Sequence, residues 1–166
     1  MSLSAFNALD ERRAAEALAL CCVSERWVSA MLGARPFKEA QSLFAAADRL
    51  WAELAEDDYL QAFEGHPKIG DISSLKEKYA ASGGLAASEQ SSLAEADDAV
   101  IGRLCEGNRV YEERFGFIFI VCASNKNALE MCELLEQRLH NDRHKELQVA
   151  AEEQRKILQL RLEKML

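Results

Sequence analysis

The 166-residue sequence is poor in residues that interrupt helices and has no long apolar run. It contains two prolines, Pro36 and Pro67, and stretches rich in Ala, Leu, Glu, Lys and Gln continue between and beyond them. The longest apolar run, Phe115 to Ala123, is about half the length that a membrane-spanning helix needs. We therefore expect an all-α protein made of one domain, residues 1–166, with no membrane partner.

Positive charge is also scarce. Twenty Lys and Arg residues face 28 Asp and Glu residues, which gives a formal net charge of -8 and a pI near 5.0. Such a surface repels nucleic-acid phosphates and anionic lipids, so nucleic acid is excluded as an expected partner. An anionic small molecule would bind only where the chain supplies local cations.

The cysteines lack the spacing of a disulfide framework or of a C-x-x-C pair. There are five of them, an odd number, and most fall within apolar patterns. No secretory signal precedes them. These features favour reduced, buried thiols in a cytoplasmic protein.

Cofactor and metal signatures are missing as well. The sequence has no G-x-G-x-x-G, phosphate-binding P-loop, G-x-S-x-G or H-E-x-x-H motif. His140 and His144 have the i, i+4 spacing of metal ligands, but Asn141 and Asp142 between them indicate a helix break, and no third ligand is suitably spaced. A solvated surface is the better interpretation, with no metal.

Helical periodicity defines most of the chain. The first expected helix begins at Asn7 or Asp10 and ends at Cys22. The others span 24–32, 37–55, 57–63, 88–115, 127–139 and 142–166. Ser88 and Asp142 are predicted N-caps. The segment from Gly65 to Ala87 loses this periodicity and predicts a long loop that carries functional groups. The apolar run Phe117 to Ala123 has no other strand to pair with, which favours a buried, extended or partly helical connector. The fold expected is a helical bundle with these two irregular segments.

His66 is the most informative residue, because Gly65 and Pro67 hold it on non-helical backbone. An imidazole presented in this way could transfer protons near neutral pH. The alternative is a solvated loop histidine, or one that satisfies a nearby carbonyl group.

Two further residues could complete a reactive set. Glu89 follows the predicted cap at Ser88, where a carboxylate is favoured by the helix dipole whatever its function. Arg161 falls on the apolar stripe of the last helix, so it must be paired or bind an anion. Its alternatives are a solvent-reaching side chain or an ion pair with Glu152 or Glu163.

Several motifs occur in an order that resembles a known family. They are His66-Pro67-Lys68-Ile69-Gly70, Ser88-Glu89-Gln90, Asn108-x-x-Tyr111, Phe115-Gly116-Phe117-Ile118-Phe119-Ile120 and Ile157-Leu158-x-Leu160-Arg161-Leu162. Together they resemble 2-oxo-4-hydroxy-4-carboxy-5-ureidoimidazoline (OHCU) decarboxylase over nearly the whole chain. The resemblance implies an all-α, cofactor-free and usually homodimeric enzyme of urate breakdown, which converts OHCU to (S)-allantoin and carbon dioxide.

The same resemblance implies roles for individual residues. His66, Glu89 and Arg161 match the catalytic positions, and the substrate-binding positions match Pro67, Ala86, Ser88, Gln90, Phe119, Ile120, Val121, Cys122 and Ala123. Ala86 departs from the family, which often has serine there, so Ser88 or the backbone amides of this stretch could replace that contact. Two other functions stay open from the residues alone: a non-catalytic helical adaptor, and an isomerase or hydrolase of a related ureido-ring compound.

Overall fold

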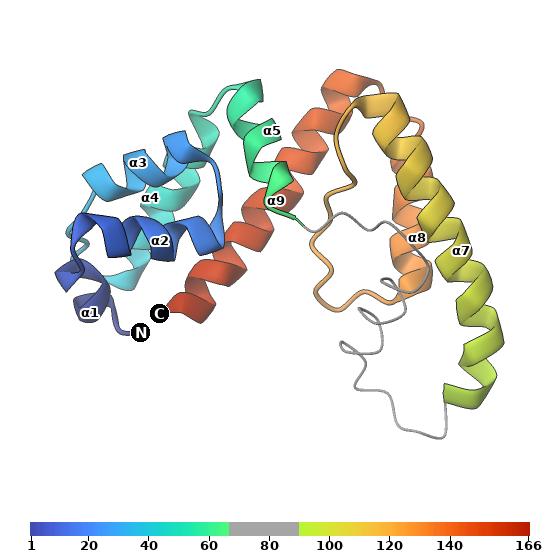
Figure 1. The fold of residues 1–166 in the computed structure, drawn as a ribbon, viewed down its shortest axis with the longest axis horizontal. Helices are drawn as coiled ribbons and strands as arrows, with labels where there is room; N and C mark the ends of the chain where they lie inside the picture. Colours follow the sequence, from blue (N-terminus) through green and yellow to red (C-terminus); the bar gives the residue numbers. More distant parts are fainter. Residues whose placement is uncertain (67–89) are drawn as a thin grey trace. The chain divides into compact units, whose positions relative to one another are not determined.

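The structure, a computed structural model, describes residues 1–66 and 90–166 and confirms the all-α prediction (Figure 1). These residues form eight helices and no β-strand. The helices are α1 (Leu3–Ala8), α2 (Glu11–Cys21), α3 (Glu25–Gly33), α4 (Ala40–Ala52), α5 (Glu56–Glu64), α7 (Gln90–Phe115), α8 (Ala128–Arg138) and α9 (Arg143–Met165). None of them combines the length and apolar character needed to cross a membrane.

Side-chain caps set many of these boundaries. Ser24 accepts a hydrogen bond from the backbone N–H of Trp27 at the start of α3, and Asp142 accepts one from Lys145 at the start of α9, as predicted for Asp142. The prediction for the first helix was incomplete. Ser2 caps a separate helix, α1, and the chain leaves the helical conformation at Leu9 before Asp10 caps α2.

The chain divides into two compact units, each with its own core. The first unit comprises Met1–His66 and Val149–Leu166, and the second comprises Pro67–Gln148. The last turns of α9 therefore belong to the first unit, and its first turns to the second. The single domain of residues 1–166 stays a prediction.

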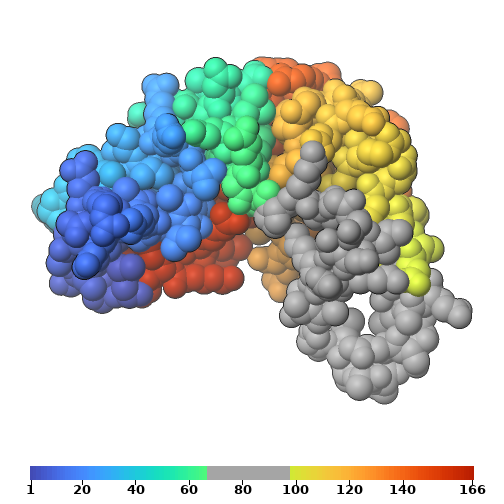
Figure 2. Space-filling view, viewed as in Figure 1, coloured from blue at the N-terminus to red at the C-terminus, as the bar shows by residue number. Residues whose placement is uncertain are grey.

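The core of the first unit consists of side chains from α1 to α5 and the C-terminal part of α9. Its fully buried members include Phe6, Leu18, Trp27, Leu43 and Leu158. The C-terminal turns of α9, drawn in red, lie directly against the helices of the first 60 residues (Figure 2). Burial of these apolar groups is the main force that holds this unit together.

Hydrogen bonds fix α9 against α4 within the first unit. The indole N–H of Trp51 donates to the carbonyl oxygen of Ala151 at 3.1 Å. Asp48 accepts hydrogen bonds from Arg155 Nη1 at 2.9 Å and from Gln159 Nε2 at 2.7 Å. These bonds, together with the shared apolar core, join α9 to α4.

In the second unit α7 packs closely against α8. A Cβ atom at Gly107 would lie 2.5 Å from Leu135 Cδ2, so only glycine allows this separation without a shift. The small core there includes Leu104, Met131 and Leu135. The modest loss of helix propensity at Gly107 is thus matched by closer packing between two helices.

The connector between α7 and α8 begins with a sharp turn at Gly116. Gly116 has φ of +80°, and its N–H donates to the carbonyl oxygen of Glu112 at 2.9 Å, which ends α7. Residues 117–123 are neither helical nor paired with a strand in the described part of the chain. Of the two predicted forms of this connector the non-helical one is found, and its side chains are all buried or half-buried as far as Cys122.

Candidate active site

His66 lies just beyond the C-terminal end of α5, on non-helical backbone as predicted. Gly65 ends the helix, and the backbone N–H of His66 donates to the carbonyl oxygen of Phe63 at 3.1 Å. The ring is half-buried. His66 is therefore held at its backbone and has part of its ring accessible.

The His66 ring contacts a glutamine that sequence reasoning missed. Its Nε2 atom forms a hydrogen bond with Oε1 of Gln154 on α9, and the Gln154 side chain is fully buried. Of the two alternatives for His66, the merely solvated ring is not found, whereas a ring that binds a nearby carbonyl oxygen is. Gln154 occupies the apolar stripe of α9, seven residues before Arg161, and a polar residue at such a position is the signal that could have identified it.

Arg161 is half-buried on the face predicted from the helical pattern. Its Nη1 donates to the carbonyl oxygen of Cys21 at 3.1 Å, in the last turn of α2, where carbonyl groups lack helical partners. Among the described residues Arg161 forms no ion pair with Glu152 or Glu163, and Glu152 pairs with Arg155. The expected alternative of an ion pair with Glu152 is not found, and four of the five guanidinium N–H groups make no hydrogen bond within these residues.

Two buried cysteines lie near Arg161. Burial raises the pKa of Cys21 to about 11 and that of Cys22 to about 11, and the positive charge of Arg161 opposes part of the rise in each case. Both thiols are therefore neutral at pH 7 and are poor nucleophiles. Neither thiol therefore competes with His66 or Arg161 as a candidate reactive group.

Arg161 and Gln154 share one face of α9. Seven residues correspond to nearly two helical turns, so the two positions are separated by roughly 10 Å along the axis. His66 contacts the first of them, which brings the predicted imidazole and guanidinium to the same side of one helix.

Most of the remaining predicted residues of this set belong to a part of the chain that the structure does not describe. Pro67, Ala86, Ser88 and Glu89 fall outside the described residues, and so does most of the predicted loop from Gly65 to Ala87. Gln90 is the first residue of α7. The approach of Glu89 to His66 stays a prediction.

The predicted pocket-lining residues 119–123 form the middle of the connector. Ile120 is buried, Phe119 and Val121 are half-buried, and Ala123 is exposed. The Cys122 carbonyl oxygen accepts a hydrogen bond from Lys126 Nζ at 2.9 Å. This segment presents carbonyl and N–H groups on irregular backbone, as a site that recognises a polar ring would require.

A buried charged network holds the connector in place and was also missed. Arg138 on α8 donates through Nη1 to the carbonyl oxygen of Ile120 at 2.7 Å, and its Cζ lies 4.6 Å from the centre of the Phe119 ring. Glu146 on α9, which is fully buried, accepts from Arg138 Nε at 2.7 Å and from the hydroxyl of Tyr111. Burial and the adjacent carboxylate raise the pKa of Tyr111, so its hydroxyl stays a donor.

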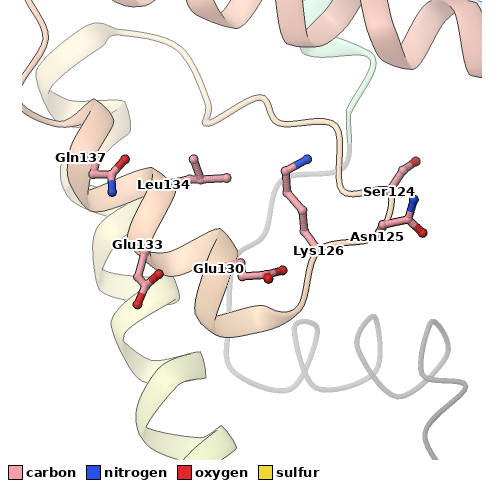
Figure 3. Close-up of a pocket in the computed structure, with 7 residues that line it drawn as sticks. All are labelled: Ser124, Asn125, Lys126, Glu130, Glu133, Leu134 and Gln137. Carbon is pink, nitrogen blue, oxygen red and sulfur yellow. The ribbon is translucent and has the colours of Figure 1, made fainter.

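One surface pocket adjoins the connector in the second unit. It has a volume of about 480 Å³, and Figure 3 shows Ser124, Asn125 and Lys126 on one side with the α8 residues on the other. Those α8 residues include Glu130 and Glu133, while Lys126 Nζ already binds the Cys122 carbonyl. The two carboxylates make the pocket unsuitable for an anion, so we do not assign the substrate to it.

Metal binding has no support in the described part of the chain. His140 and His144 are both exposed, and Gln148 donates to His144 Nε2 at 3.1 Å. No three His, Cys, Asp or Glu residues of this part are grouped as a metal site requires.

Comparison with known proteins identifies the family. The family model for OHCU decarboxylase matches residues 7–163 of the chain. The chain belongs to the OHCU decarboxylase family. The match extends through both compact units and includes His66, Glu89 and Arg161.

Two relatives of the chain are about a third and about a quarter identical to it. The uric acid degradation bifunctional protein TTL of Arabidopsis thaliana is 34% identical over 149 residues, which are 88% of this chain and 45% of that protein. The chain thus spans about half the length of this relative. The 2-oxo-4-hydroxy-4-carboxy-5-ureidoimidazoline decarboxylase of Haloferax volcanii is 26% identical over 98% of this chain and 94% of that protein.

A solved structure from the family has the same fold. A crystal structure of OHCU decarboxylase in the presence of (S)-allantoin aligns with 94% of this chain and 97% of that one, with 31% identity and a TM-score of 0.71. The all-α architecture expected from composition and periodicity is therefore also the architecture of a relative.

Proposed function

We propose that this chain decarboxylates OHCU to (S)-allantoin and carbon dioxide in the breakdown of urate. The family match over residues 7–163 carries this proposal. It is supported by the 31% identical OHCU decarboxylase whose crystal structure was obtained with (S)-allantoin. The contact of His66 with α9, the helix that carries Arg161, agrees with a small-molecule site.

The chemistry requires no separate electron acceptor. OHCU carries its carboxylate on a ring carbon that also bears a hydroxyl group, next to a C=N bond. When the C–C bond to the carboxylate breaks, carbon dioxide leaves and the electron pair moves toward this C=N bond. The hydroxyl becomes the carbonyl group of allantoin after losing its proton, the neighbouring carbon gains a proton, and the ring nitrogen of the former C=N bond gains a further proton from solvent. The protein must then orient the ring, move protons and select one face for protonation, without a cofactor.

His66 is proposed to remove the hydroxyl proton, because imidazole changes charge near neutral pH. Glu89 is proposed to polarise this imidazole or to bind the ureido nitrogens, and Gln90 to pair with polar groups of the ring. Pro67, the stretch from Ala86 to Ser88 and the connector residues 119–123 are proposed to complete the walls of the site. Such polar contacts would reject analogues that lack the ureido group.

Arg161 is proposed to bind a ring oxygen or the ureido group of the substrate. Negative charge leaves the carboxylate as the C–C bond breaks, so a guanidinium bound to that carboxylate would favour the substrate over the transition state. A contact with the ring oxygen has the opposite effect, since negative charge accumulates on the ring.

Arg161→Met is expected to lower kcat/KM by about 10- to 100-fold, the usual effect of losing one hydrogen bond to a charged group. Methionine keeps much of the apolar stem, so circular dichroism should show an intact helical fold. Arg155→Met on the same helix is the matched control, because Arg155 pairs with Asp48 and Glu152 instead. Unchanged kcat/KM in Arg161→Met would show that Arg161 has a structural role only, through its hydrogen bond to the Cys21 carbonyl oxygen at the end of α2.

The direct test of the proposed function uses freshly prepared OHCU. The wild-type protein should accelerate the loss of OHCU ultraviolet absorbance and produce the circular dichroism signal of (S)-allantoin. Racemic product at the spontaneous rate would contradict the proposal and favour a helical adaptor. Consumption of OHCU without release of carbon dioxide would indicate an isomerase or hydrolase.

A homodimer in the cytoplasm is the proposed state of the protein. The dimer follows from the family resemblance alone. The cytoplasm is supported by the five cysteines, none of which forms a disulfide bond.

A further inference from the structure

We infer that Gln154 is a positioning residue that holds His66 in the tautomer with the proton on Nε2, so that Nδ1 exchanges the proton during the reaction. The tautomer follows from the contact between the two side chains. Its catalytic meaning rests on the proposed function. Neither the sequence motifs nor the family comparison assigns a role to residue 154.

The direction of the hydrogen bond determines the tautomer. Gln154 faces the ring with its carbonyl oxygen Oε1, which can only accept a hydrogen bond. The ring nitrogen that it contacts, Nε2, must then carry hydrogen. A neutral imidazole has one N–H group, so Nδ1 is the nitrogen with the lone pair.

The surroundings of Gln154 indicate that packing alone does not explain a glutamine there. The side chain is fully buried, and its neighbours on the same face of α9, Ala151 and Leu158, are apolar. Its Nε2 group has no hydrogen-bond partner among the described residues. A buried amide that leaves a donor unsatisfied is unfavourable for folding, and a leucine or methionine would fill the space without this defect.

The amide suits the proposed proton transfer because it is neutral. A carboxylate at position 154 would hold the ring in its charged form, whereas an amide oxygen accepts from Nε2–H in both the neutral and the charged ring. When Nδ1 takes the hydroxyl proton of the substrate, the ring becomes an imidazolium. The hydrogen bond to Oε1 then becomes charge-assisted and stronger, which stabilises the imidazolium as it forms. The proton on Nδ1 is returned later in the cycle, and the ring regains its starting tautomer.

Nitrogen NMR of protein labelled with ¹⁵N-histidine tests the tautomer without any substrate. At a pH where His66 is neutral, its Nε2 should resonate as a protonated nitrogen and its Nδ1 as an unprotonated one. His66→Asn identifies the signals of His66. The exposed ring of His140 serves as an internal reference, since its tautomers should be close to those of free histidine.

Gln154→Met should move the His66 signals toward the mixture of tautomers seen for free histidine. Gln159→Met is the matched control, because Gln159 lies on the same helix and binds the Phe44 carbonyl and Asp48 instead. That control should leave the His66 signals unchanged. If Gln154→Met does not fold, Gln154→Glu supplies the test, because its carboxylate should keep the His66 ring charged, with both nitrogens protonated, to a higher pH than in the wild type. A His66 signal that titrates as in the wild type would then count against the contact.

Kinetics separates positioning from binding. In Gln154→Met we expect kcat to fall about tenfold or more, as when a residue that orients a reactive histidine is lost, with a smaller change in KM. A wild-type ring protonated on Nδ1, or signals unaltered by Gln154→Met, would overturn the inference. If the signals behave as expected but OHCU is not decarboxylated, the proposed function fails while the positioning of His66 by Gln154 stands.

Discussion

His66→Ala is expected to reduce the enzymatic rate by about 10²- to 10⁴-fold, the usual contribution of a placed proton-transfer group. Spontaneous decay of OHCU then supplies most of the product, so the allantoin formed should be racemic. Both quantities come from one experiment, in which ultraviolet absorbance reports the rate and circular dichroism reports the handedness.

The control for this experiment is His140→Ala, because His140 is exposed and lies in the second unit. It should keep the wild-type rate and product. Stereospecific turnover by His66→Ala at a rate near that of the wild type would remove His66 from the mechanism. The family assignment would survive that result, because it rests on the match of residues 7–163.

Glu146→Ala is expected to lower the free energy of unfolding by about 3–5 kcal/mol, the cost of removing one partner from a buried ion pair. Glu146 is fully buried and accepts hydrogen bonds from Arg138 Nε, Tyr111 and Asn141 Nδ2, the last at 2.9 Å. Without its carboxylate the charge of Arg138 remains buried and unbalanced. Urea unfolding followed by circular dichroism measures the change, with the slope compared between variants.

Two further variants show whether the buried charge causes this loss. Combining Glu146→Leu with Arg138→Met removes both charges and should recover much of the lost stability. Glu136→Ala breaks the exposed pair with Arg103, whose Nη2 lies 2.8 Å from Glu136 Oε1, and should have little effect. Equal destabilisation by Glu146→Ala and Glu136→Ala would contradict the importance of burial.

Local signals in the sequence predicted most of the helices. Ser24, Asn127 and Asp142 each cap the backbone N–H three residues later, and the apolar stripe of the last helix faces the core. The short helix α1 escaped because six residues contain too little periodicity for a reliable prediction. Its stability comes from the burial of Phe6 against distant parts of the first unit.

The candidate site was predictable where one residue carries the signal. His66 stands out through its neighbours Gly65 and Pro67, and Arg161 through its position on an apolar face. The partner of Arg161 was not predictable, because it is a backbone carbonyl 140 positions away. The partner of His66, Gln154, is 88 positions away along the chain. The two side chains meet only when the C-terminal part of α9 packs within the first unit.

The charged pair of the second unit was hidden for a related reason. Arg138 and Glu146 lie in the last and first turns of consecutive helices, where such charges are favoured by the helix dipole and are normally exposed. Only the turn at residues 139–142 brings them together in the interior. A pattern based on one helix at a time does not reveal such a pair.

The hydrogen bond from Arg161 to residue 21 ends on a main-chain oxygen. Every amino acid carries that oxygen, so mutational drift at position 21 can change the side chain without removing the acceptor. Arg161 would keep its anchor through such replacements as long as α2 ends at the same place. The orientation of this guanidinium thus depends on the path of the backbone. It can stay the same when the side chain at position 21 is replaced.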